Sequence, residues 1–262
     1  MTVPARTVAP RGPVLDTARL RDRYPAAAAT VVPAAHRARL ASCGDPDALA
    51  WEVLYRLEPE LFDRLVAGEA LHPGVLGWIE GPFGRAVEVG AGTGRLTAHL
   101  AARCGAVVAV DAAAPMLERL VVRAPGFPGG GSNVRAVAAD ACAIPLPDGW
   151  ADAVFTCATV APRPAAWADG CLRELERVCR PAGIVVAVWP HTPDWLCSHG
   201  YRRVEFPGPM AHEFASPAEA LELARVFYPD RADAVAALGS ASIPYEVLGI
   251  NAPRDLAWKV VG

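Results

Sequence analysis

The sequence lacks several features that mark whole classes of protein. Its seven cysteines are scattered with no C-x-x-C pair, so a zinc ribbon, a dithiol redox motif and a disulfide framework are not supported, and no metal site is expected. No run of 18 uncharged apolar residues exists, which excludes a predicted membrane span. The first 13 residues contain arginines but no apolar segment, so no secretory signal is predicted. We therefore expect a cytoplasmic protein with buried thiols.

The chain also lacks a large excess of charge of either sign. The net charge is −3, which gives no field to attract a polyanion, so nucleic acid is not an expected partner. Lys259 is the only lysine, and with abundant Ala, Pro and Gly this indicates a coding bias, so the number of arginines receives no functional weight. A length of 262 residues with 53% hydrophobic content indicates one globular α/β domain with appendages.

A glycine-rich stretch organises the chain. An apolar run over residues 86–89 predicts a buried strand, the glycines after it predict a tight turn, and a helix is predicted from Leu96 onward. This arrangement brings backbone close to a nucleotide-like ligand at a helix N-terminus. The dinucleotide fingerprint G-x-G-x-x-G needs a glycine where this chain has Arg95. Glu88 at the strand end would repel a pyrophosphate, so a ligand with a cationic amino-acid end fits better than NAD.

A second buried strand over residues 106–110 ends in Asp111. An acid that ends a strand about 20 residues beyond a glycine turn is typical of the position that holds a ribose diol. Its two oxygens match two hydroxyls in a bidentate contact. Alternatively, Asp111 caps the next helix, which has Pro115 in its first turn, and both roles are compatible.

The motif Glu88-Val89-Gly90-Ala91-Gly92-Thr93-Gly94 resembles the first motif of class I S-adenosylmethionine-dependent methyltransferases. Residues 86–183 resemble the small-molecule (type 11) branch, which includes the ubiquinone/menaquinone methyltransferases. The resemblance implies S-adenosylmethionine as cofactor, with Ala112 and Met116 on its adenine side. The cofactor-binding residues that we predict are Glu88, Gly90, Ala91, Gly92, Thr93, Gly94, Asp111, Ala112, Met116, Asp140, Ala141 and Cys157.

The segment from Asp140 to Pro147 resembles the family's acid-Ala-x-x-Leu-Pro element. The resemblance implies that Asp140 accepts from the adenine amino group, although Asp and Pro also build ordinary turns. A strand over residues 150–157 resembles the family's fourth motif, beside the reacting methyl. The chain then departs from the family, because residues 158–164 lack the histidine or aromatic pair of many relatives. A general base from this loop is therefore not expected.

Five apolar strands that alternate with helices predict an α/β fold with a doubly wound, mostly parallel sheet. The resemblance implies seven strands in a Rossmann-like methyltransferase fold. We predict an antiparallel C-terminal strand pair from residues 244–250 and 255–261, and a helix that starts at Ser216-Pro217-x-Glu219. Residues 1–45 are predicted as a partly mobile N-terminal extension and 46–262 as the methyltransferase domain. Within it we expect a helical lid (46–80), with a helix start at Asp45-Pro46-Asp47 and a break at Pro59, and a substrate-side insertion (190–243).

Methyl transfer from a sulfonium depends mainly on positioning and exclusion of water, so an enzyme needs no obvious base. The candidate catalytic residues are His191 after the fifth strand, Tyr55 on the lid and His212 in the insertion. For His191 an inconsequential loop position is the alternative, and for Tyr55 core packing is. We predict a methyltransferase for a small-molecule acceptor, with oxygen ahead of nitrogen or carbon as the acceptor atom. A noncatalytic member that keeps the fold as a scaffold is the alternative, and the sequence does not indicate the oligomeric state.

Overall fold

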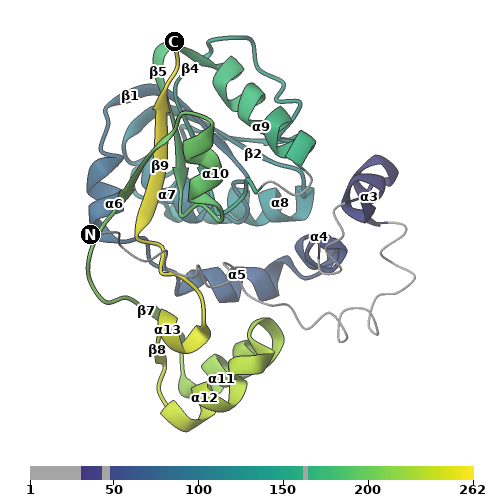
Figure 1. The fold of residues 1–262 in the computed structure, drawn as a ribbon, viewed down its shortest axis with the longest axis vertical. Helices are drawn as coiled ribbons and strands as arrows, with labels where there is room; N and C mark the ends of the chain where they lie inside the picture. The colour runs from purple at the N-terminus through teal and green to yellow at the C-terminus, as the bar shows by residue number, and fades with distance from the viewer. Residues whose placement is uncertain (1–30, 43–47, 162–164) are drawn as a thin grey trace, which may run out of the picture.

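The structure, a computed structural model, describes residues 31–42, 48–161 and 165–262. The predicted helix start at Asp45-Pro46-Asp47 and residues 1–30 of the predicted N-terminal extension lie outside these residues. The centre is a seven-stranded sheet in the order β3-β2-β1-β4-β5-β9-β6 (Figure 1). Its strands are β1 (Phe83–Val89), β2 (Cys104–Asp111), β3 (Val134–Ala138), β4 (Ala151–Cys157), β5 (Cys179–Val188), β6 (Arg202–Glu205) and β9 (Asp255–Val260).

The sheet is parallel except at β9, which runs antiparallel to both β5 and β6. The predicted fold class is therefore confirmed, but the predicted partner of the last strand is wrong. Residues 245–248 form the short helix α13 (Tyr245–Leu248), which starts after Pro244 and ends at Gly249 with φ 73°. A proline before a helix and a left-handed glycine after it favour helix over strand. The neighbouring β6 takes the free edge of β9 instead.

Helices cover both faces of the sheet. Successive strand residues point to opposite faces, so each strand contributes side chains to the cores on both sides. Ala86 of β1 packs with the core of α6 and α7, whereas Val87 and Val89 pack with α9 and α10. The flanking helices are α6 (Pro73–Trp78), α7 (Arg95–Ala101), α8 (Ala114–Arg123), α9 (Ala165–Val178) and α10 (Pro193–Ser198), with a 3-10 turn η1 (Ala124–Gly126). In the described part of the chain, no helix has the length and apolar character needed to cross a membrane.

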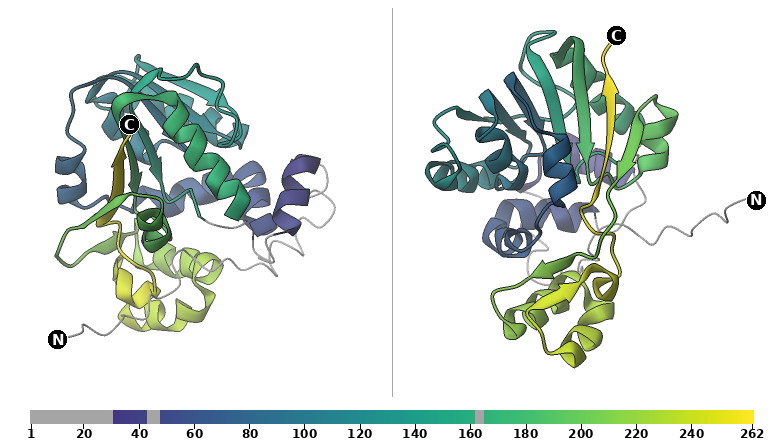
Figure 2. Two further views of the ribbon diagram at one scale, coloured as in Figure 1. Left: turned by 45° about the horizontal axis from the view of Figure 1, so that its top comes forward. Right: turned by 90° about the vertical axis from the view of Figure 1, so that its left-hand side faces the viewer.

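The carboxyl edge of the parallel strands is covered by two groups of elements (Figures 1 and 2). The first is α3 (Ala34–Ala41), α4 (Ala48–Leu57) and α5 (Pro59–Ala67), with the break at Pro59 as predicted. The second, which we call the cap, spans residues 211–250. It consists of β7 (Ala211–Glu213), α11 (Pro217–Phe227), η2 (Pro229–Arg231), α12 (Ala232–Leu238), β8 (Ser242–Pro244) and α13. The predicted start of α11 is confirmed, because the Ser216 hydroxyl accepts from the Glu219 N–H at 3.1 Å.

Candidate functional site

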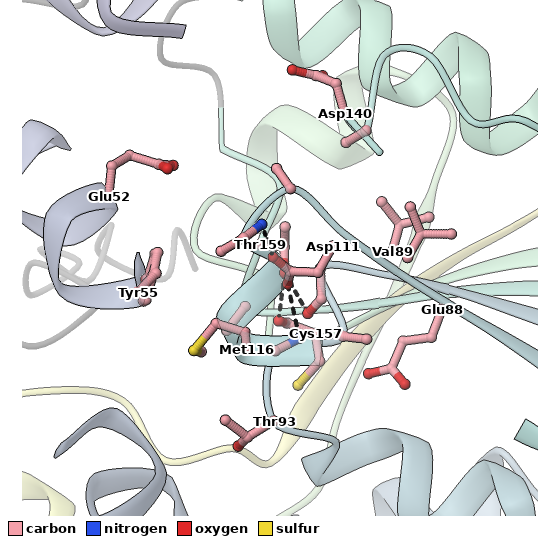
Figure 3. Close-up of a pocket in the computed structure, with 18 of the residues that line it drawn as sticks. Glu52, Tyr55, Glu88, Val89, Thr93, Asp111, Met116, Asp140, Cys157 and Thr159 are labelled. Carbon is pink, nitrogen blue, oxygen red and sulfur yellow. Dashed lines mark hydrogen bonds between the residues drawn. The ribbon is translucent and has the colours of Figure 1, made fainter. Parts of the chain in front are cut away.

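A cavity of about 250 Å³ opens at the carboxyl ends of β1, β2 and β4 (Figure 3). Every predicted cofactor residue except Gly94 lines it, so positions up to 69 residues apart in sequence share one wall. Those lining residues are Glu88, Gly90, Ala91, Gly92, Thr93, Asp111, Ala112, Met116, Asp140, Ala141 and Cys157.

The three glycines of the turn all have positive φ, and an added side chain would meet different surroundings at each of them. A Cβ on Gly92 (φ 55°) would point into the cavity, with Met116 as its nearest neighbour at 3.6 Å. A Cβ on Gly90 (φ 75°) would lie 2.1 Å from the Thr159 hydroxyl, which packs against the turn. A Cβ on Gly94 (φ 97°) would collide with Phe127 at 2.8 Å. Gly94 therefore serves the start and packing of α7 and is the one predicted cofactor residue that does not line the cavity.

Asp111 bonds the glycine turn and the residue that precedes α8, while its ribose contact stays a prediction. One carboxylate oxygen accepts from the Gly92 N–H and the other accepts from the Ala113 N–H, each at 2.8 Å. Burial raises the pKa of this carboxyl, and the two backbone bonds act against that rise. The side chain fixes the turn and the start of α8. Because each oxygen has a second acceptor site, it can still bind a diol.

Glu88 lies beneath the turn and is 1% exposed. Its carboxylate accepts from the Thr97 hydroxyl of α7 at 2.5 Å. Burial raises the pKa of Glu88 to about 8, although the Thr97 bond and the Arg95 charge favour the ionised form. A buried acid in this state would be stabilised as a carboxylate by a cationic amino group placed beside it.

Asp140 forms the opposite end of the cavity and already has three partners. It accepts from the Cys142 N–H (2.9 Å), the Trp167 indole (3.3 Å) and the Arg39 guanidinium (2.7 Å). Burial alone would raise the pKa of Asp140, but these bonds and the Arg39 charge lower it overall. Arg39 also lies 4.6 Å over the Trp167 ring. The cavity wall thus includes α3, and neither Arg39 nor Trp167 was predicted.

The lid helices α4 and α5 contribute Glu52, Tyr55 and Phe62 to the cavity. Tyr55 contacts Phe62 edge-on, with ring centroids 5.1 Å apart. Burial, with nearby acids, raises the pKa of Tyr55 far above its ordinary value. The phenol therefore stays protonated at neutral pH, and it lines the cavity.

The two predicted histidines lie in different places. The His191 ring donates from Nε2 to the Ala158 carbonyl at 2.7 Å, beside the cavity wall but not on it. His212 is fully buried in β7, where it pairs with Ile243 of β8 and stacks on Phe214 at 4.0 Å. Burial lowers the pKa of His212 to about 4. It does not line the cavity, so the structure does not bring it together with the other predicted site residues.

Two further wall residues were missed as site residues. The Thr159 hydroxyl donates to the Cys157 carbonyl at 2.9 Å and holds its side chain against Gly90. Arg95 pairs with Glu69, donates to the Cys157 sulfur at 3.2 Å and lies 5.2 Å over the Trp189 ring. The glycine motif pointed to position 95 only as a departure from the dinucleotide pattern, and its partner Glu69 has no local sequence signal.

Comparison with known proteins agrees with this geometry. Residues 86–183 match the family model of the methyltransferase domain. The YcgJ protein of Bacillus subtilis is 15% identical with a TM-score of 0.51, over 73% of this chain and 100% of that one. A SAM-dependent methyltransferase of Aquifex aeolicus is 19% identical with a TM-score of 0.41, over 66% of this chain and 90% of that one. No curated protein matches the chain. At such identity the likeness to YcgJ shows a shared fold and says nothing of the reaction.

Proposed function

We propose that residues 86–183, which match the family model of the methyltransferase domain, form a class I S-adenosylmethionine-dependent methyltransferase domain, and that the protein methylates a small-molecule acceptor on oxygen, chiefly by positioning. One observation carries the proposal. Glu88 and Asp111, which end neighbouring strands, both line a single cavity that the turn at Gly90 and Gly92 also lines. A carboxylate for an ammonium group, one for a diol and an open glycine between them fit the cofactor's two polar ends.

The cofactor, when bound, supplies a methyl group already activated on a sulfonium. We assign Glu88 to its amino group, Asp111 to its ribose hydroxyls and Asp140 to its adenine amino group. Gly92 leaves the backbone open to the ligand, because its missing Cβ would point into the cavity. Met116 and Ala112 line the same wall on the Asp111 side. Arg39 already binds Asp140, so the adenine end binds beneath α3.

Methyl transfer to an oxygen can rely on positioning and does not require a strong base. Orientation of the reactants can contribute about 7–11 kcal/mol. Helices α4 and α5 and the cap lie over the carboxyl edge of the sheet (Figure 2), where they would limit the access of water to a bound substrate. Tyr55 stays protonated, so His191 is the proposed proton acceptor for a hydroxyl. Its ring reaches the cavity wall through the hydrogen bond to the Ala158 carbonyl, and Ala158 itself lines the cavity. The described cysteines are all free thiols with no disulfide among them, which supports the proposed cytoplasmic location.

Calorimetric titration with S-adenosylhomocysteine and, separately, with NAD tests the cofactor assignment. We expect saturable binding of the first and none of the second. Gly92→Arg should abolish the binding because its side chain would fill the cavity, while the matched control Gly126→Arg, in open space on η1, should bind normally. Binding of NAD, or failure of S-adenosylhomocysteine to bind, would refute the assignment.

Turnover separates the enzyme from a noncatalytic scaffold. The protein is incubated with methyl-labelled S-adenosylmethionine and a metabolite extract, and label in new compounds is analysed by mass spectrometry. We expect label on oxygen of a small molecule. Label on nitrogen or carbon would correct the acceptor atom, and binding without any label transfer would favour the scaffold.

A further inference from the structure

Two thiols lie in contact next to Asp140, which forms one end of the cavity. The Cys142 Sγ is 3.2 Å from the Cys171 Sγ, although the two residues are 29 positions apart in sequence. Cys142 lies in the loop after β3 and is half-buried, whereas Cys171 lies in the middle of α9 and is fully buried. Both are free thiols. The fold therefore places a partly accessible thiol directly against a buried one.

The two sulfurs are close enough to form a disulfide after a small movement. The S–S bond of a disulfide is about 2.05 Å long, so the sulfurs need to approach each other by roughly 1.2 Å. Cys171 is held inside a helix of 14 residues, so we expect the loop that carries Cys142 to make this movement. Gly170 lets Cys142 lie close to α9, because an added Cβ would be 3.1 Å from the Cys142 Sγ.

The same loop positions Asp140, whose side chain lines the cavity. The Cys142 N–H donates to one Asp140 oxygen at 2.9 Å, and the Trp167 indole donates to that oxygen at 3.3 Å. The Cys142 Sγ also lies 3.2 Å from the Trp167 carbonyl. Formation of a disulfide would therefore move a residue that holds the Asp140 carboxylate in place.

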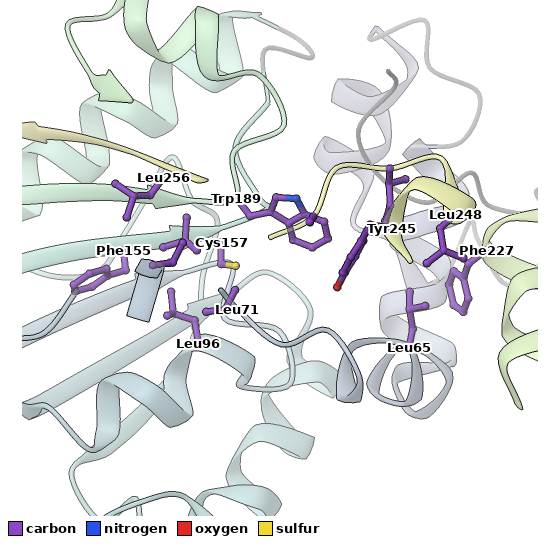
Figure 4. Close-up of a cluster of buried hydrophobic side chains, with 14 of the residues drawn as sticks. Leu65, Leu71, Leu96, Phe155, Cys157, Trp189, Phe227, Tyr245, Leu248 and Leu256 are labelled. Carbon is purple, nitrogen blue, oxygen red and sulfur yellow. The ribbon is translucent and has the colours of Figure 1, made fainter. Parts of the chain in front are cut away.

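Among the residues that the structure describes, no other pair of thiols is in contact. Cys157 lines the cavity but belongs to a different core, where Figure 4 shows it beside Leu71 and Leu96. Cys197 in α10 is exposed. The pairing of two sulfurs is thus a property of the Asp140 end of the cavity, and Cys197 provides a control.

Cys142 is the thiol that a reagent from solution meets first, because Cys171 is fully buried. Burial raises the pKa of both thiols. The hydrogen bond between them acts against that rise at Cys142 and adds to it at Cys171. The thiolate is the nucleophile in disulfide exchange, so both accessibility and ionisation favour Cys142 for the first step and Cys171 for the second.

We propose that Cys142 and Cys171 form a reversible disulfide by exchange with a low-molecular-weight disulfide, and that this bond weakens cofactor binding through Asp140. In the first step the Cys142 sulfur attacks the oxidant, which gives a mixed disulfide and releases one thiol. In the second step the Cys171 sulfur attacks the Cys142 Sγ and the second thiol leaves. The protein loses two electrons and two protons, and the oxidant takes up both to become two thiols.

A transient disulfide of this kind is compatible with a reducing compartment, where regulatory disulfides form and are reduced again. Only the effect on cofactor binding rests on the proposed function. The reaction between the two thiols depends on their contact alone, so the two parts of the inference are tested separately.

Glutathione disulfide is the probe for the thiol reaction. The reduced full-length protein is incubated with it at about pH 8, where more of the thiol is ionised, and the remaining thiols are then alkylated. Chymotrypsin cuts after Trp150 and Phe155, between the two cysteines, so a disulfide joins two separate peptides in the mass spectrum. We expect a link between Cys142 and Cys171 that dithiothreitol removes. Absence of this link would overturn the inference.

Cys171→Ala isolates the first step of the reaction. Without the second thiol, the exchange should stop at a mixed disulfide, which adds the mass of one glutathionyl group to the peptide that contains Cys142. Glutathionyl groups found only on other cysteines would show that Cys142 does not react first, and this outcome would contradict the proposed order of steps.

Calorimetric titration with S-adenosylhomocysteine tests the effect on the cavity. We expect the oxidised wild type to bind it about fivefold or more weakly than the reduced wild type, which is the effect of losing about one hydrogen bond, and to recover with dithiothreitol. Cys142→Ser should bind equally before and after treatment, whereas the control Cys197→Ser should respond as the wild type does. Equal affinity of the two wild-type forms, or an equal fall in Cys142→Ser, would refute the coupling.

The two readouts keep this inference apart from the proposed function. If the reduced protein fails to bind S-adenosylhomocysteine, the proposed function fails, while the linked peptides still decide whether the thiols react. If the reduced protein binds it and no link forms between Cys142 and Cys171, only this inference is refuted.

Discussion

The carboxylate of Asp111 accepts a hydrogen bond of 2.8 Å from the backbone N–H of Gly92, 19 residues earlier in the chain. Its second oxygen accepts from the Ala113 N–H at the start of α8. One side chain therefore joins the ends of two neighbouring parallel strands and sets the shape of the turn that lines the cavity.

Asp111→Asn tests this arrangement. Asparagine has one acceptor oxygen where the carboxylate has two, so one of the two backbone N–H groups loses its partner and the charge disappears. We expect the affinity for S-adenosylhomocysteine, measured by calorimetry, to fall about tenfold or more. Asp148→Asn, which alters an exposed acid paired with Arg177, is the control. Equal affinity of Asp111→Asn and wild type would exclude the carboxylate from the ligand contact.

Gly90→Ala should destabilise the turn through a collision with one neighbouring residue. All three of the nearest atoms to the added Cβ, at 2.1–2.7 Å, belong to the Thr159 side chain. We expect a lower melting temperature for Gly90→Ala and partial recovery when Thr159→Gly is added, since only the strain of positive φ then remains. If the second substitution gives no recovery beyond the sum of the single effects, Thr159 is not the obstacle.

Glu88 should make stability fall with rising pH. Below its ordinary pKa of 4.5 the carboxyl is protonated in both the folded and the unfolded chain. Between that value and the folded pKa of about 8 only the unfolded chain ionises, so the folded state binds more protons and loses stability as pH rises, by at most about 1.4 kcal/mol per pH unit.

Thermal unfolding of the ligand-free protein between about pH 5 and pH 9 measures this effect. Glu88→Gln removes the titrating group, so its melting temperature relative to that of the wild type should rise steadily with pH. Glu60→Gln, at an acid 77% exposed, should follow the wild-type curve. Parallel curves for wild type and Glu88→Gln would contradict the raised pKa.

The Glu69–Arg95 pair is expected to contribute far more to stability than the surface pairs. Glu69→Gln leaves the Arg95 side chain, which is 17% exposed, without its buried ionic partner, and breaking a buried pair in this way costs up to about 3–5 kcal/mol. Glu222→Gln alters an ion pair with Arg64 in which both side chains are at least 40% exposed, and such pairs contribute about 0–1 kcal/mol. Denaturant unfolding of the two variants compares the costs. Similar small losses would mean that Arg95 finds another partner in the mutant.

Elements with strong local signals could be predicted from the sequence. The strand ending near Glu88, the glycine turn and the strand ending in Asp111 are consecutive, so their apolar patterns and breakers place them without any tertiary information. The same holds for the start of α11, where the serine cap, the proline and the acid stand within four residues of one another.

The parts that depend on distant contacts could not be predicted. Arg39 meets Asp140 across 101 residues and Arg95 meets Glu69 across 26, and neither pair has a periodic pattern to mark it. Residues 245–248 were misassigned because a short apolar segment is ambiguous between strand and helix. The pairing of β9 with β6 is decided by the edge of the sheet, which only the assembled fold defines.

The attachment of the cap has a consequence for how this enzyme can change. The cap is inserted between β6 and β9, which are hydrogen-bonded neighbours, and the Phe206 N–H donates to the Arg254 carbonyl at 2.9 Å where the chain leaves and re-enters the sheet. Exchange of residues 211–250 for another segment with closely spaced ends would leave the glycine turn and its two acids in place. If the proposed function holds, such chimaeras offer a route to new acceptors with the cavity at the glycine turn retained.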